Sequence, residues 1–152
     1  MWPETHELVD VELVQLRRLM DTGRPLLDKV RTSEPDQTEL MAMAAILHSF
    51  YGGVENISKR IALEIDDSVP SGMSSHSALL DQMARPTDLR PAVISEDLHE
   101  RLDAYLDFRH VFRHAYAFDL KWRKMRDLVL QLEETLDRLD AELEAFFSSP
   151  SA

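Results

Sequence analysis

Residues 40–61, LMAMAAILHSFYGGVENISKRI, hold the pattern that decides the fold. Apolar side chains recur there at alternating steps of three and four residues, which places them on one face of a helix. These positions are Leu40, Met43, Leu47, Phe50, Val54, Ile57 and Ile61. The capping sequence Ser33-Glu34-Pro35-Asp36 precedes them and marks the beginning of the helix. Gly52 and Gly53 lie inside it, so we expect either a close helix crossing or a local kink at this point.

A second apolar pattern with the same spacing predicts a heptad-patterned C-terminal helix over residues 120–148. Its members are Met125, Val129, Leu132, Leu136, Leu139, Leu143 and Phe146. Three heptads of this kind pack within a bundle or its dimer more often than they form an independent coiled coil. Residues 149–152 then form a short tail.

Three further helices are predicted from the positions of proline, glycine and capping residues. The first covers residues 4–21, is interrupted by Gly23-Arg24-Pro25 and resumes near Leu26. A short helix covers residues 76–83, and a longer one begins at Ser95 and runs toward about Phe118. Strand alternation is absent from the sequence. We therefore predict an all-α bundle of four to five helices, with residues 1–152 forming one domain.

The composition excludes several classes of protein. The chain has 152 residues, 17 Lys and Arg against 28 Asp and Glu, and a formal net charge of −11. It contains no cysteine, which excludes disulfide frameworks, thiolate nucleophiles and cysteine zinc sites. No apolar run approaches the roughly 18 residues of a membrane span, and the N-terminus lacks the pattern of a signal peptide. We therefore expect a soluble, cytoplasmic protein with no membrane partner.

The charges are distributed unevenly along the chain. Residues 109–126 contain six cations and one acid, a net charge of +5, so the remaining 134 residues sum to −16. The net charge alone argues against a surface that binds nucleic acid over its whole extent. The distribution predicts instead a small cationic cleft on an acidic body, where contact with an anionic ligand is confined to the cleft.

The sequence DFRHVFRHAY, residues 107–116, lies in this cationic segment. At about 100° per residue, one face of the predicted helix is apolar. That core face contains Phe108, Val111, Phe112 and Ala115. A contiguous polar arc contains Arg109, His110, Arg113, His114 and Tyr116. Arginine binds phosphate oxygens and histidine transfers protons near neutral pH, so this arc suits cleavage of a phosphodiester. With RNA as substrate the 2′-hydroxyl is the nucleophile, and no metal, cofactor or protein nucleophile is required.

Arg109-x4-His114-x-Tyr116 resembles the Arg-x4-6-His motif of HEPN-domain ribonucleases, in the Arg-x4-His-x-Tyr form of HepT-like toxins. His110 fits the habit of that family to place a polar residue directly after the arginine, whereas Arg113 departs from its pattern. Residues 44–62, the Ser-Gly-rich loop before HSALLDQM and residues 94–120 are also similar to the corresponding parts of HepT-like proteins. The resemblance covers most of residues 8–130.

The resemblance implies a HEPN-like bundle that dimerises around the motif helix to form a composite, metal-independent endoribonuclease site. Arg109 would stabilise the phosphate and His114 would transfer protons, while His110 and Arg113 would support the site or bind RNA. The implied partners are RNA, with tRNA and mRNA as candidates, a second copy of the chain, and a minimal nucleotidyltransferase that acts as antitoxin and modifies Tyr116. On a straight helix Arg109 and His114 diverge by about 140°, which favours action across a dimer.

Two other interpretations remain open at this stage. The protein could be a noncatalytic helical partner or nucleotide-binding subunit of a nucleotidyltransferase, with the arginines as phosphate anchors. Asp107, His110 and His114 are spaced three and four residues apart, which is compatible with a metal-binding bundle, although Arg113 between the histidines would repel a dication. Glu55 is expected to be a solvated helix acid. The histidines outside the motif helix that we expect at the surface or in the core are His6, His48 and His76.

Overall fold

The computed structural model describes residues 2–149, which form six α-helices and contain no strand. The elements are α1 (Pro3–Lys29), α2 (Gln37–Ile61), the π-helical turn η1 (Ala62–Asp66), α3 (Ser75–Met83), α4 (Glu96–His114), the 3-10 turn η2 (Ala117–Asp119), α5 (Trp122–Leu130) and α6 (Leu132–Ser148). The predicted all-α class is confirmed. Of the predicted tail, residues 150–152 lie outside the described residues. Within the described part of the chain, no helix is both long and apolar enough to cross a membrane.

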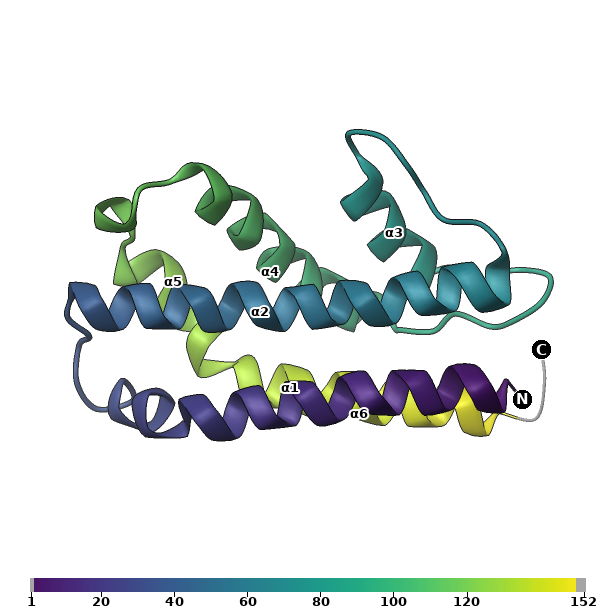
Figure 1. Ribbon diagram of the computed structural model, residues 1–152, viewed down its shortest axis with the longest axis horizontal. Coiled ribbons are helices and arrows are strands. Elements are labelled where there is room, and N and C mark those ends of the chain that lie inside the picture. The colour runs from purple at the N-terminus through teal and green to yellow at the C-terminus, as the bar shows by residue number, and fades with distance from the viewer. Residues whose placement is uncertain (1, 150–152) are drawn as a thin grey trace.

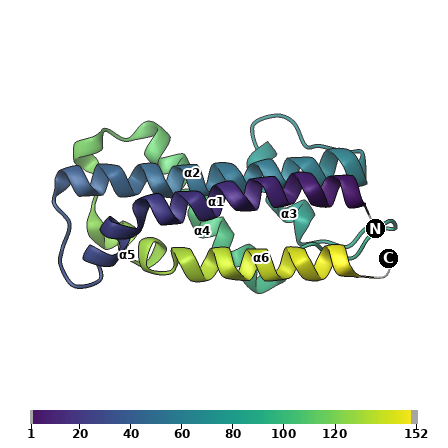
Figure 2. The same cartoon turned by 60° about the horizontal axis from the view of Figure 1, so that its bottom comes forward.

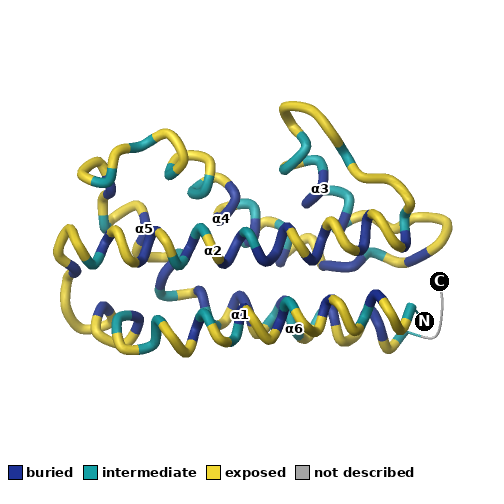
Figure 3. The backbone as a smooth tube through the Cα atoms, viewed as in Figure 1, coloured by how far each residue is buried: buried dark blue, intermediate teal, exposed yellow. Residues whose placement is uncertain are grey.

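In the view of Figure 1, helix α2 lies between α1 and α6 on one side and α3 and α4 on the other. The turned view of Figure 2 shows α1 running alongside α2, with α6 at the opposite edge of the molecule from α2. All seven apolar positions predicted for α2 are buried. Asp36 accepts a hydrogen bond from the backbone of Glu39, whose side chain accepts one from the backbone of Asp36, so the predicted capping sequence caps the helix at Asp36. The helix begins at Gln37, and Pro35 precedes it instead of lying in its first turn as the sequence predicts. The buried residues follow the inner faces of the long helices, whereas the loop before α3 and the segment after α4 are largely exposed (Figure 3).

Helix α1 crosses α2 closely, which decides between the two explanations for Gly52 and Gly53. A Cβ added at Gly53 would lie 2.5 Å from Cδ2 of Leu16 on α1, while one at Gly52 would meet nothing within 4 Å. The predicted interruption of α1 at residues 23–25 is wrong, because the helix continues through Pro25. Proline removes a single backbone hydrogen bond there, and packing of Gly23 against Ile46 on α2 keeps the helix in place.

The C-terminal segment is divided at Gln131, where the sequence predicts one helix over residues 120–148. This division raises the number of helices above the predicted four to five. All seven predicted apolar positions are buried, but α5 packs on α2 and α4 while α6 packs on α1 and α4. The hydroxyl of Tyr105 donates to the carbonyl of Leu128 at 2.6 Å, satisfying a backbone acceptor near the end of α5. Two different sets of neighbours therefore favour two helices with separate directions.

Helix α4 ends at His114, earlier than the predicted end near Phe118. Ala115 and Tyr116 are extended, so the placement of Tyr116 on the polar arc of the helix is wrong. The side chain of Gln37 donates to the carbonyl of Ala117 at 2.6 Å, and Leu120 is buried, which together hold the chain in a turn after the helix. Val111 is 59% exposed, so its predicted place on the core face is also wrong.

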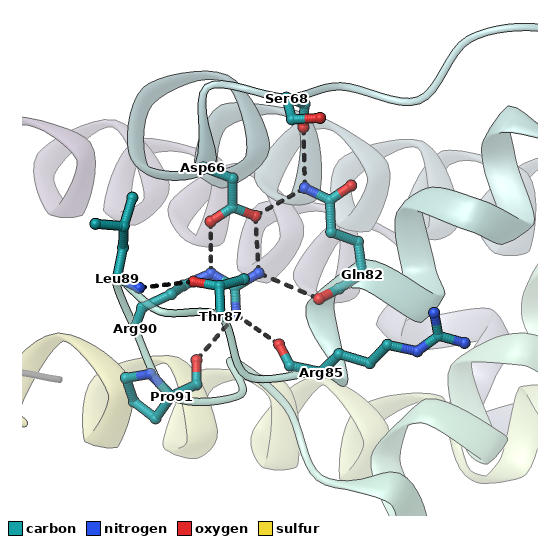
Figure 4. Close-up of polar contacts among 8 residues, drawn as sticks. All are labelled: Asp66, Ser68, Gln82, Arg85, Thr87, Leu89, Arg90 and Pro91. Atoms are coloured by element: carbon teal, nitrogen blue, oxygen red, sulfur yellow. Dashed lines mark hydrogen bonds and ion pairs between the residues drawn. The ribbon is translucent and has the colours of Figure 1, made fainter.

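A buried ion pair fixes α3 to η1, the turn that follows α2. The side chain of Arg90, in the connection before α4, is fully buried and donates to both carboxylate oxygens of Asp66 at 2.7 and 2.8 Å (Figure 4). Its remaining bonds go to the carbonyls of Gln82, Arg85 and Pro91. Gln82 on α3 also donates to Asp66. Every nitrogen of the guanidinium is therefore bonded, as burial of a charge requires.

Candidate functional site

A buried carboxylate, Glu55 of α2, joins the motif helix to α3. Its side chain is 6% exposed. The guanidinium of Arg109 on α4 donates to Oε2 of Glu55 at 2.9 Å, and Nδ1 of His76 on α3 lies 2.7 Å from the same oxygen. Lys59, one turn along α2, lies 3.4 Å from the other carboxylate oxygen. The expectation of a solvated acid at Glu55 is therefore wrong, because a guanidinium, an imidazole and an ammonium group converge on it.

The electrostatics of this cluster favour an ionised Glu55. Burial alone would raise the pKa of this carboxyl group, but His76, Arg109 and Lys59 outweigh burial and lower the pKa below its ordinary value. The guanidinium of Arg109 is held by this carboxylate, while its Nε atom is buried with no hydrogen-bond partner in the described part of the chain. Arg109 therefore keeps a spare donor.

A cavity of about 270 Å³ opens beside this cluster, between the amino end of α3 and the motif helix. Its lining residues are Met73, Ser74, His76, Ser77, Leu106, Asp107, Arg109, His110 and Arg113. Ser74 precedes α3 without making a side-chain cap, and the N–H of Ser75 donates to the carbonyl of Gly72. Within the described residues, the N–H groups of His76 and Ser77 are therefore left for another acceptor. The lining contains two arginines, two histidines and the amino end of a helix, but only one acid, Asp107. The cavity therefore suits an anion.

The pKa of His48 on α2 is affected by the same positive charges. Its ring lies 5.5 Å from that of Phe112 on α4, measured between centroids. Burial lowers the pKa of His48, and the charges of Arg109 and Arg113 lower that pKa further. A neutral His48 is therefore favoured beside the two arginines of the motif helix.

The structure brings together only some of the residues predicted for the site. Arg109, His110 and Arg113 line the cavity, whereas His114 does not. His114 is exposed at the end of α4, with its ring 5.1 Å from that of His110. Tyr116 is 72% exposed in the extended segment beyond the helix, where its ring stacks on that of Phe118. Within one chain, His114 therefore lies outside the lining of the Arg109 cavity.

The metal interpretation receives no support from the motif helix. Among residues 2–149, the only three potential ligands whose donor atoms all lie within 4.8 Å of one another are His6, Asp10 and Glu144. These residues are on α1 and α6, and Asp107, His110 and His114 form no such group. His6 itself stacks on the ring of Phe147.

Comparison with known families decides the relationship of the chain. A family model described as HepT-like protein matches residues 42–149. The chain belongs to the HepT-like family. The match begins within α2 and extends through α6, so it includes the whole of the cavity lining, while α1 lies outside it. No curated protein and no solved structure matches the chain.

In this HepT-like protein, the sequence alone does not predict that Glu55 and His76 belong to the cluster. Glu55 follows an apolar position of the α2 pattern, and a buried acid there requires a cation that lies 54 residues away. His76 follows a Ser-Gly-rich loop and is 21 residues from its carboxylate partner. The position of Glu55 next to Val54 is a weak signal of burial, because an acid bordering an apolar face can turn toward the core only with a partner.

Proposed function

We propose that this HepT-like protein is a metal-independent endoribonuclease toxin whose site lies on the motif helix. The observation that supports this function is the Arg109 guanidinium, held by buried Glu55 at the wall of a cavity that also contains Arg113 and His110. A fixed guanidinium stabilises the charge that develops on a phosphate in the transition state. His110 and Arg113 then contact the RNA backbone, and His114 transfers protons.

The proposed reaction uses the ribose of the substrate as its nucleophile. The 2′-oxygen loses its proton to a base and forms a bond to the adjacent phosphorus, and the bond from phosphorus to the 5′-oxygen breaks. The departing oxygen takes up a proton, which leaves a 2′,3′-cyclic phosphate and a 5′-hydroxyl end. Arg109 stabilises the phosphate oxygens throughout. No electron transfer occurs and no group is left on the protein.

A dimer around α4 would supply His114 from a second copy. An apolar groove of about 590 Å³ lies between α4 and α5, with Phe108, Val111 and Leu128 among its lining residues. Val111 and Phe118 are exposed near the end of the motif helix. Apolar surface of this kind supports an interface between two copies of the chain. Arg109 of one chain would then act with His114 of its partner.

The proposed setting is a toxin-antitoxin pair with a minimal nucleotidyltransferase. The exposed hydroxyl-bearing ring of Tyr116 supports its assignment as the modified residue. Incubation with the neighbouring nucleotidyltransferase and ATP should add nucleotide mass to Tyr116, and Tyr116→Phe should block the addition. Unmodified Tyr116 after incubation with an active nucleotidyltransferase would contradict this part of the proposal.

Cleavage of RNA in the presence of EDTA tests the activity. We expect the wild-type protein to cleave, and Arg109→Ala and His114→Ala to lose activity by about 10² to 10⁴-fold while remaining helical by circular dichroism. Arg18→Ala and His6→Ala, both on α1 and outside the cavity lining, are matched controls that should cleave as the wild type does. A folded dimer that cleaves no RNA would instead support the noncatalytic partner, and activity that requires an added metal would contradict the mechanism.

A further inference from the structure

His76 and Arg109 share one oxygen atom of Glu55, although α3 and α4 carry them. An imidazole and a guanidinium that contact the same carboxylate oxygen lie within reach of a single phosphate group. Both also line the cavity of about 270 Å³. This pair belongs to one chain, unlike the proposed pair of Arg109 and His114.

We propose that His76 is the general acid of the cleavage, giving its Nε2 proton to the departing 5′-oxygen while His114 of the partner chain accepts the 2′-hydroxyl proton. This proposal rests on the ribonuclease function proposed above. It assigns one proton transfer to each of two histidines, where the motif alone offers a single one.

The contacts of the His76 ring set up this role. Nδ1 lies 2.7 Å from the ionised carboxylate of Glu55 and therefore carries a proton, which it donates. Nε2 makes no hydrogen bond within the described residues, and the side chain is 40% exposed where it lines the cavity. When Nε2 is protonated, the carboxylate balances the charge of the ring and fixes its orientation. After donation to the 5′-oxygen the ring is neutral, with its Nδ1–H bond to Glu55 intact.

Helix α3, which carries His76, is attached to its neighbouring elements by polar contacts. Near the carboxyl end of α3, Gln82 donates to Asp66 of η1 and accepts from Arg90, which attaches the helix to η1 (Figure 4). Nε2 of His99 on α4 lies 2.7 Å from Asp81 of α3, which adds a second attachment. A catalytic group needs such support to stay within hydrogen-bond distance of its target. The fold therefore presents His76 and Arg109 on two elements that are fixed to each other.

A substrate with a good leaving group distinguishes proton donation from a structural role. We compare a normal RNA dinucleotide with one in which the bridging 5′-oxygen is replaced by sulfur, because sulfur departs without being protonated. His76→Asn is the informative variant, since its amide can still donate to Glu55 but has no counterpart of Nε2. We expect it to lose about 10² to 10⁴-fold on the oxygen substrate and to recover to within about tenfold of the wild type on the sulfur substrate.

Two variants serve as controls. His114→Ala removes the proposed base, so we expect it to be impaired on both substrates. His6→Ala removes a histidine that lies 3.5 Å from carboxylate oxygens of Asp10 and Glu144, outside the cavity, and should cleave both substrates as the wild type does. Circular dichroism and urea unfolding verify that each variant folds.

The possible failures are distinct. A wild-type protein that cleaves neither substrate overturns the proposed function and the role of His76 together. If the wild type cleaves and His76→Asn matches it on the oxygen substrate, the proposed function stands and His76 is not the acid. Equal impairment of His76→Asn on both substrates also overturns the assignment, because it indicates that His76 only supports Glu55 and Arg109.

Discussion

Glu55 connects the chemistry of the site to the stability of the fold. It is buried on α2, and Arg109, His76 and Lys59 each lie within an ion-pair distance of its carboxylate. These three partners are themselves partly exposed. Water therefore screens part of the attraction, and the cluster stabilises less than a fully buried pair, whose disruption costs about 3–5 kcal/mol.

We predict that Glu55→Gln lowers the free energy of unfolding by about 1–2 kcal/mol at pH 7. The folded protein holds the pKa of Glu55 below its ordinary value of 4.5. The stabilisation is therefore complete above that value and is lost as pH falls through the folded pKa. Urea unfolding from pH 7 to pH 3 should show the difference between wild type and variant shrinking at low pH. Glu64→Gln, in a loose surface pair with Arg60, is the control and should change stability by under about 0.5 kcal/mol.

Single residues were predictable where the sequence places them on one helix. Arg109, His110 and Arg113 are close in sequence, so the helical period alone brings them to one wall of the cavity. Glu55 and His76 join them only through the packing of three helices. No local pattern encodes that approach, which explains why both residues were assigned to other roles.

At the scale of elements, the neighbouring glycines of α2 offer a matched pair of substitutions. We predict that Gly53→Ala destabilises the protein by about 1–3 kcal/mol, because the new methyl group overlaps Leu16 of α1. Gly52→Ala should instead stabilise it by up to about 1 kcal/mol, since alanine favours the helix and meets no neighbouring atom. Thermal unfolding of the two variants measures both signs, and a Gly53→Ala variant as stable as the wild type would contradict the close crossing as the reason for glycine.

The buried Asp66–Arg90 pair predicts a second effect at this scale. Asp66→Asn leaves the guanidinium of Arg90 buried without a countercharge and should lower the free energy of unfolding by about 3–5 kcal/mol. Asp67→Asn is the neighbouring control, because Asp67 is exposed and has a positive φ of 52° that asparagine also tolerates. We expect the control to match the wild type within about 0.5 kcal/mol in urea unfolding. Equal stability of Asp66→Asn and wild type would show that the pair does not hold α3.

Helices were predictable to the extent that a repeated apolar pattern defines them. The buried faces of α2 and of the C-terminal segment follow the alternating three- and four-residue steps. The ends are set by contacts distant in sequence. The bond from Gln37 to Ala117 spans 80 residues, and the bond from Tyr105 to Leu128 crosses from one helix to another. The early end of α4 and the division at Gln131 therefore could not be read from periodicity.

For the whole molecule, the distribution of charge limits how RNA can bind. The chain carries a net charge of −11, while Arg109, His110 and Arg113 lie together on one wall of a cavity. An acidic body repels RNA outside such a site, so binding should depend on few phosphate contacts. We predict that Arg113→Ala reduces the slope of log affinity against log salt concentration by about 0.7 for single-stranded RNA. Fluorescence anisotropy from 50 to 300 mM salt measures it, with Arg18→Ala as the control of unchanged slope.

The proposed dimer makes a prediction that no single chain can satisfy. If Arg109 acts with His114 of the partner, a heterodimer of Arg109→Ala and His114→Ala chains keeps one complete site of two, because each chain supplies what the other lacks. Co-expression with two different affinity tags isolates this heterodimer. We expect about half of the wild-type rate from it, while both parent homodimers stay inactive. A heterodimer of Arg109→Ala and His76→Asn should remain inactive, since those two residues serve the same site from the same chain. An inactive first heterodimer would place Arg109 and His114 in one chain and remove the reason for a composite site.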